Sequence, residues 1–158
     1  MSHNAINSLY GHANREQTVL TPEWLVDLVR EEFCGRIGLD PCYAEGCYTD
    51  PESSCTWPLQ DGLASDWTDR TYVNPPYNNL QPWLERASSS KGRTIVLCPV
   101  RPHRSWWMHA FYKACEVMVM RPFPFAGHKQ VFPAPLCLMY FNGRFRGGWV
   151  GRATGMLK

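Results

Sequence analysis

The consecutive residues Asn74-Pro75-Pro76-Tyr77 combine two hydrogen-bond acceptors, a rigid backbone and an aromatic ring in one short segment. An aromatic amine is a poor nucleophile because its nitrogen lone pair is delocalised into the ring. The Asn74 side-chain oxygen and the Pro75 carbonyl can accept hydrogen bonds from both amine hydrogens, which favours the pyramidal, nucleophilic form. Consecutive prolines hold that carbonyl in place before a ligand arrives, and Tyr77 can stack on the ring. The segment indicates chemistry on an amine; a rigid loop without a catalytic role is the simpler alternative.

The elements around this segment are those of an α/β protein. Helices are predicted from Thr21-Pro22 to Gly35, over 80–88 and over 105–115, and strands over 37–39, 71–73, 94–99, 116–120, 136–141 and 148–153. Thr21 is expected to cap the first helix, with Pro22 in its first turn. This alternation predicts an open, mostly parallel sheet with helices on both faces. Asp40 and Asn74 then follow strands, and ligands bind at the carboxyl ends of strands in such sheets.

Further short segments accompany the motif in a definite order. They are Thr21-Pro22-Glu23-Trp24, Leu39-Asp40-Pro41-Cys42, Asp61-Gly62-Leu63, Asp66-Trp67, Asn74-Pro75-Pro76-Tyr77 and Trp83. From about Thr21 to Phe141 this order resembles the small phage- and prophage-type DNA N6-adenine methyltransferases, the Dam-like family. The resemblance implies a single-domain, Rossmann-like methyltransferase fold. It also implies methyl transfer from S-adenosylmethionine to an adenine flipped out of double-stranded DNA.

The resemblance also implies which residues bind the cofactor. Thr21, Pro22 and Trp24 would lie against its methionine and adenine parts. Asp40, with Pro41 after it, would face the amino group or the sulfonium. Asp66 would accept a hydrogen bond from the adenine amine. One departure is that residues 42–46 contain a single, late glycine where many methyltransferases have a Gly-x-Gly turn.

Each of these cofactor assignments has a structural alternative. Asp40 could be a turn carboxylate before proline, and Trp24 could belong to the apolar stripe of the first helix. Asp61 and Asp69 compete with Asp66 for contact with the cofactor adenine, because all three precede the strand at 71–73.

The second half of the chain is strongly basic although the net charge is only +2. From Lys91 onward the sole acidic residue is Glu116. Residues in two segments are candidates for contact with nucleic acid: Arg101, His103, Arg104, Arg121, His128 and Lys129. Such mixtures of cations and aromatic residues suit phosphates and unstacked bases. The alternative is a solvated basic surface, with Trp106 and Trp107 packing a helix.

Length and composition set the remaining limits. With 158 residues the chain fits one domain, expected over 21–158 after a poorly ordered lead-in at 1–20. No apolar run is long enough to span a membrane, and the start does not resemble a secretion signal, so a cytoplasmic protein is expected. The seven cysteines include no Cys-x-x-Cys pair, so no metal is expected. Loops 42–70 and 122–135 are left to provide any preference for a DNA sequence.

Other readings of the motif remain open from the sequence. The same segment suits methylation of cytosine N4, of an RNA base or of a protein glutamine. A catalytically inactive, DNA-binding relative is a further alternative, although the intact motif argues against it.

Overall fold

A computed structural model describes residues 19–56 and 59–144. They contain α2 (Glu23–Glu32), β1 (Leu39–Asp40), β2 (Ser53–Ser54), β3 (Thr71–Val73), α3 (Leu80–Ser89), β4 (Thr94–Pro99), α4 (Ser105–Lys113), β5 (Glu116–Met120) and β6 (Leu136–Phe141). The strand predicted over 148–153 and the predicted lead-in as far as residue 18 lie outside the described residues.

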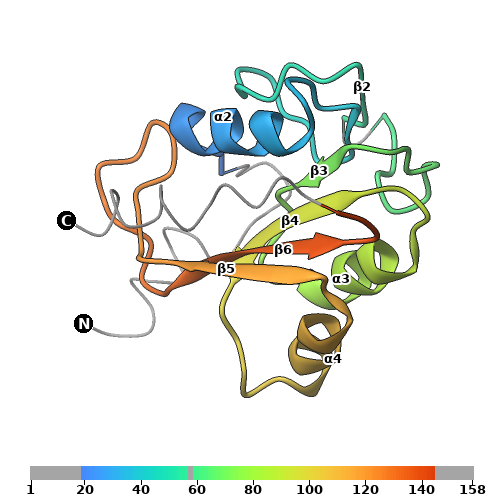
Figure 1. The fold of residues 1–158 in the computed structure, drawn as a ribbon. Coiled ribbons are helices and arrows are strands. Elements are labelled where there is room, and N and C mark those ends of the chain that lie inside the picture. Colours follow the sequence, from blue (N-terminus) through green and yellow to red (C-terminus); the bar gives the residue numbers. More distant parts are fainter. Residues whose placement is uncertain (1–18, 57–58, 145–158) are drawn as a thin grey trace.

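The six strands form one sheet in the order β2-β1-β3-β4-β6-β5. Neighbouring strands from β2 to β4 are parallel, and β6 is antiparallel to both β4 and β5. Helix α2 lies on one side of the sheet, and α3 and α4 lie on the other (Figure 1). The predicted α/β fold, with an open, mostly parallel sheet and helices on both faces, is confirmed.

The central strands were predictable because both of their faces are covered. Every residue of β3, β4 and β6 is buried, so each strand is a continuous apolar or β-branched run without the alternation of a half-exposed strand. Predicted and observed bounds agree for these three strands and for β5.

Helix α2 begins differently from the prediction. Pro22 is its N-cap residue, and no side chain caps the helix. The Thr21 hydroxyl is instead 2.8 Å from the Tyr72 hydroxyl on β3. Both groups are buried, and a buried hydroxyl without a partner is costly, so this pairing takes precedence over capping. The helix ends as predicted near Gly35, whose φ of 100° suits glycine.

The irregular segment 42–70 contains a strand that the sequence does not reveal. Ser53 and Ser54 form β2, which pairs with Leu39 and Asp40 of β1. Two serines carry no strand pattern. Ser53 is held by two hydrogen bonds to the Gly38 carbonyl oxygen, one from its backbone amide at 2.9 Å and one from its hydroxyl at 3.1 Å. β1 itself lies one residue further along than the predicted end at residue 39.

The sheet has a topological switch point between β1 and β3. After β1 the chain continues to β2 on one side, and it then returns to β3 on the other side of β1. Strands β1, β3, β4 and β5 all end at the same edge of the sheet, after Asp40, Val73, Pro99 and Met120 respectively. We call this the carboxyl edge. In open α/β sheets ligands bind outside this edge, at the switch point.

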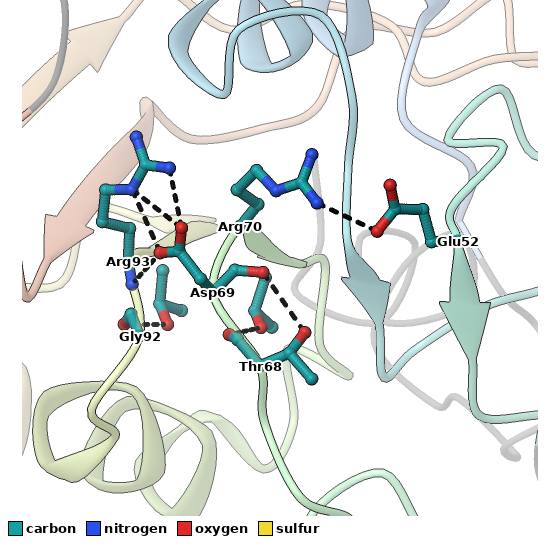
Figure 2. Close-up of polar contacts among 8 residues, drawn as sticks. Glu52, Thr68, Asp69, Arg70, Gly92 and Arg93 are labelled. Atoms are coloured by element: carbon teal, nitrogen blue, oxygen red, sulfur yellow. Dashed lines mark hydrogen bonds and ion pairs between the residues drawn. The ribbon is translucent and has the colours of Figure 1, made fainter.

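The opposite edge is held by charged pairs (Figure 2). The Arg93 guanidinium donates to both Asp69 carboxylate oxygens, with Nη2 2.7 Å from Oδ2. Hydrogen bonds from Arg93 lower the pKa of Asp69 to about 2. Arg70 donates to Glu52 at 2.9 Å. These residues precede β3, β4 and β2. Asp69 therefore forms its ion pair at the edge where these strands begin, opposite the carboxyl edge.

Among the described residues, no helix has both the length and the apolar character that a membrane crossing needs. The same residues contain no group of three or more histidine, cysteine or acidic side chains arranged to hold a metal ion.

Candidate active site

Asn74 directly follows β3 at the switch point. Its Nδ2 donates a hydrogen bond of 2.7 Å to the Val19 carbonyl oxygen. Because that carbonyl requires a donor, the contact fixes the orientation of the amide and leaves Oδ1 as an acceptor. No hydrogen bond between described residues uses Asn74 Oδ1 or the Pro75 carbonyl oxygen. Neither of the two acceptors expected from the sequence is occupied by another described residue.

Two further contacts hold the loop after Asn74. The Asn79 amide donates to the Pro76 carbonyl oxygen at 3.2 Å, and Arg101 Nη1 donates to the Tyr77 carbonyl oxygen at 3.0 Å. The motif is therefore tethered at its start, its centre and its end. This is the preorganisation that a pair of fixed acceptors needs.

Tyr77 is more enclosed than the sequence suggests. Its side chain is 8% exposed, and its ring centroid lies 6.1 Å from that of Phe125 and 5.6 Å from that of Phe132. Its hydroxyl is buried without a hydrogen-bond partner among the described residues, and burial raises its pKa well above the usual value. The hydroxyl is thus unsuited to proton transfer, and the ring is the part available for function.

Asp40 ends β1, the strand that pairs with β3 across the switch point. It is 4% exposed. Thr49 Oγ1 donates to its Oδ2 at 2.8 Å, and the Cys42 amide donates to its Oδ1 at 3.0 Å. Burial raises its pKa to about 6 despite these two donors. A carboxylate that is desolvated in this way attracts a cationic ligand, which would compensate its charge.

Comparisons with known proteins identify the family. The family model for DNA N-6-adenine-methyltransferase (Dam) matches residues 12–144. The chain belongs to this Dam family. A DNA N-6-adenine-methyltransferase of Haemophilus phage HP1 is 31% identical over 81 residues, which are 49% of this chain and 46% of the relative. The alignment thus spans about half the length of that curated relative.

A solved structure supports the fold of this Dam-family chain. PH1948 of Pyrococcus horikoshii, described provisionally as an RNA methyltransferase, superposes with a TM-score of 0.53 over 87% of this chain and 93% of its own. The two sequences are 11% identical, so the likeness concerns the fold alone. It confirms the Rossmann-like methyltransferase fold expected from the sequence.

The other residues predicted to bind the cofactor differ in their burial and their contacts. Thr21 and Pro22 are buried, with Thr21 against β3. Trp24 is 37% exposed, and its ring contacts Phe123 edge to face at 5.2 Å. Asp66 is exposed, and no hydrogen bond or ion pair of the described residues involves its side chain.

Asp61 lies in a turn at the carboxyl edge. Its Oδ1 accepts from the Leu63 amide at 3.0 Å. The next residue, Gly62, sits so close to the Pro41 carbonyl that a side chain there would clash with it. Gly62 also accepts a hydrogen bond from Trp67 Nε1 at 2.8 Å. The turn is therefore packed directly onto the end of β1.

The basic residues predicted to contact nucleic acid all lie in loops that follow β4 and β5, at the carboxyl edge. Exposed members of this set are His103, Arg104, Arg121, His128 and Lys129. Arg101 differs, since it is half-buried and holds the motif. Trp107 is buried and donates to the Pro99 carbonyl oxygen, which is the helix-packing role considered for it above.

Val19 and Thr49 contact the site although the sequence did not single them out. Each is tied to a predicted site residue, Val19 to Asn74 and Thr49 to Asp40. Neither belongs to a motif, and their partners are 55 and 9 residues away. No sequence signal was available to find them.

The buried Tyr77 hydroxyl leads to a specific prediction. Tyr77→Phe is expected to keep its activity and to unfold at the same or a higher temperature, because it removes a buried hydroxyl that has no partner. Tyr77→Ala is expected to lose activity and about 3–5 kcal/mol of stability with its ring. Thermal unfolding and methyl transfer check both, with the exposed Tyr48→Phe as a control for hydroxyl removal. A Tyr77→Phe protein without activity would show that the hydroxyl takes part.

Proposed function

We propose that the chain transfers a methyl group from S-adenosylmethionine to N6 of an adenine in DNA. The observation that carries the proposal is the tethered Asn74 amide. Its Nδ2 is used by Val19 while Oδ1 and the neighbouring Pro75 carbonyl oxygen remain as acceptors. Two fixed acceptors match the two hydrogens of an exocyclic amine. Membership of the Dam family favours adenine over cytosine, RNA or glutamine.

The carboxyl edge fits a cationic methyl donor on its β1 side. Asp40 is buried, and burial has raised its pKa, so a positive sulfonium or ammonium group would stabilise its charged form. Thr21, Pro22, Trp24, Asp40 and Pro41 would hold this cofactor. S-adenosylmethionine supplies an electrophilic methyl group on sulfur.

Asp66 is the partner proposed for the cofactor's adenine amine, with Asp61 as its competitor. The Asp61 turn is packed on Pro41 at the end of β1. Ser65 and Trp67, on either side of Asp66, both donate to the Gly62 carbonyl oxygen of that turn. Asp69, paired with Arg93 at the opposite edge, is unsuited to this role.

The residues of the motif do the chemical work on the substrate side. Asn74 Oδ1 and the Pro75 carbonyl accept from the amine hydrogens, so the nitrogen lone pair can point at the methyl carbon. A nitrogen–carbon bond forms as the sulfur–carbon bond breaks, and the amine then releases one proton to solvent. Catalysis in this scheme rests on position and on the fixed acceptors, and it requires no general base.

DNA would lie on the β4–β5 side of the same edge. The loops there carry Arg101, His103, Arg104, Arg121, His128 and Lys129, which can contact phosphates without specifying sequence. The flipped adenine would stack on Tyr77. Because Phe125 and Phe132 now cover that ring, loop 121–135 must move aside when the base enters.

The wider setting follows from the same proposal. A DNA substrate and the phage relative suit a phage- or prophage-encoded enzyme in the cytoplasm of a bacterial host. The catalytic domain would comprise residues 21–158, together with the contacts that Val19 and Leu20 make to Asn74 and Ala126.

Tritiated methyl transfer tests the proposal. The protein is incubated with labelled S-adenosylmethionine and unmethylated double-stranded DNA, and the DNA is then digested to nucleosides. We expect label in N6-methyladenine and little transfer to DNA that is already methylated. Label confined to cytosine, RNA or protein would contradict the proposal. Cofactor binding by calorimetry without any transfer would identify an inactive DNA-binding relative.

A further inference from the structure

Arg101 occupies an unusual position among the basic residues of the carboxyl edge. It lies two residues after β4, the strand that pairs with β3. Its Nη1 donates to the Tyr77 carbonyl oxygen at 3.0 Å. Its neighbours in sequence, His103 and Arg104, are exposed, but Arg101 is half-buried. No other side chain of the described residues hydrogen-bonds to the backbone of residues 75–77.

Within residues 19–56 and 59–144, the Arg101 charge has no carboxylate partner. None of the ion pairs between described residues includes it, and the nearby Arg104 adds a second positive charge. A guanidinium remains charged at every physiological pH. A half-buried cation without a counter-ion is costly, so the position favours an anionic ligand, which the described part of the chain does not provide.

The guanidinium can contact two partners at once. It has five N–H donors in a planar fork, and one of them is used by the Tyr77 carbonyl. The remaining donors suit the oxygens of a phosphate, which arginine binds with two arms. The Arg101 side chain alone would then join this phosphate to the Tyr77 carbonyl oxygen, in the motif that receives the base.

We propose that Arg101 is a positioning residue that couples phosphate binding to the geometry of Asn74-Pro75-Pro76-Tyr77. One arm holds the Tyr77 carbonyl, and the other donors bind the backbone phosphate of the flipped nucleotide. The acceptors at Asn74 and Pro75 are then held in the reactive arrangement when DNA is in place. The proposal rests on the proposed function, and it assigns Arg101 a role beyond the general attraction of DNA.

Three variants test this role: Arg101→Met, Arg101→Lys and, as a matched control, Arg104→Met. At saturating DNA and cofactor, Arg101→Met is expected to lower kcat by at least about tenfold, because small displacements of reacting groups are costly. Arg104→Met is expected to raise KM for DNA and leave kcat unchanged. Arg101→Lys keeps the charge but has no fork, so its kcat is expected to stay low. Wild-type kcat in either Arg101 variant would overturn the proposal.

A second measurement does not depend on catalysis. Hydrogen exchange of the Asn78 and Asn79 amides is followed with and without a short DNA duplex. The duplex is expected to slow exchange in the native protein and in Arg104→Met at saturating DNA, but not in Arg101→Met. Equal protection in Arg101→Met would overturn the coupling. A native protein that shows this protection but methylates no adenine would refute the proposed function and leave the coupling supported.

Discussion

Replacing Asn74 by alanine is expected to lower the rate of methyl transfer at least about a hundredfold, the usual cost of removing a preorganised hydrogen-bonding group from an active site. The variant loses Oδ1, one of the two acceptors available to the amine. It also loses the tether to the Val19 carbonyl oxygen, which costs about 1 kcal/mol of stability. Thermal unfolding should therefore change little, and cofactor affinity should remain close to that of the native chain.

The two ends of the Asn74 amide can be tested separately. Asn74→Asp keeps an acceptor but loses the donor, and it brings a carboxylate oxygen towards the Val19 carbonyl, where the native contact is 2.7 Å. We expect an intermediate rate, because the acceptor is present but poorly held. Asn78→Ala, an exposed position in the same loop, is the control and should have normal turnover. Single-turnover rates at saturating DNA make the comparison, and normal turnover by Asn74→Ala would refute the catalytic role.

How far the sequence predicts this fold depends on what holds each element in place. The strands at 71–73, 94–99 and 136–141 were predictable because burial within the sheet demands apolar and β-branched residues. The strand at 116–120 is only partly buried, and its valines and methionines made it predictable. β2 was not, because Ser53 and Ser54 join the sheet through backbone hydrogen bonds, which any residue type can make. The start of α2 was misjudged because the hydroxyl of Thr21 has a buried tertiary partner on β3.

The same distinction applies to the candidate site. Asp40 and Asn74 stand in recognisable motifs at strand ends, and the switch point brings them to adjacent strands. The tethers at Val19 and Thr49 depend on the folded chain and leave no pattern. Tyr77 was predicted to be the stacking residue. The sequence does not show that Phe125 and Phe132 cover its ring, because they belong to a loop that begins more than forty residues further along the chain. Composition could not separate Arg101 from its exposed neighbours, because the difference lies in burial.

Asp40→Asn is expected to weaken cofactor binding strongly and, at the same time, to stabilise the cofactor-free protein at pH 8. The pKa of Asp40 is raised to about 6 in the folded protein, from about 3.9 in an unfolded chain. The folded state thus favours the protonated carboxyl. The contribution of this preference to the free energy of unfolding is fully present below about pH 4, and it is lost as the pH rises through about 6. At neutral pH the buried carboxylate is a cost on the order of 2–3 kcal/mol.

Thermal unfolding against pH checks the sign of this effect. Asp40→Asn should unfold at a higher temperature than the native chain at pH 8, and the difference should vanish below about pH 4. Asp69→Asn is the matched control with the opposite sign. The pKa of Asp69 is lowered to about 2 by Arg93, so its loss should destabilise the protein at pH 8, and this difference should fade as the pH drops from 4 towards 2. Equal unfolding temperatures for Asp40→Asn and the native chain at pH 8 would contradict the buried charge.

Binding measurements then test whether the buried Asp40 carboxylate contributes to cofactor affinity. Calorimetry with S-adenosylmethionine should give a much lower affinity for Asp40→Asn, and the affinity of the native chain should fall as the pH drops below about 6. S-adenosylhomocysteine, which has no sulfonium charge but retains the ammonium group, locates the contact. If Asp40 faces the ammonium, the variant loses affinity for both molecules; if it faces the sulfonium, only the methyl donor is affected. Unchanged affinity for both molecules would show that Asp40 does not contact the cofactor. Cofactor binding would then not explain why a carboxylate is kept charged inside the fold at neutral pH.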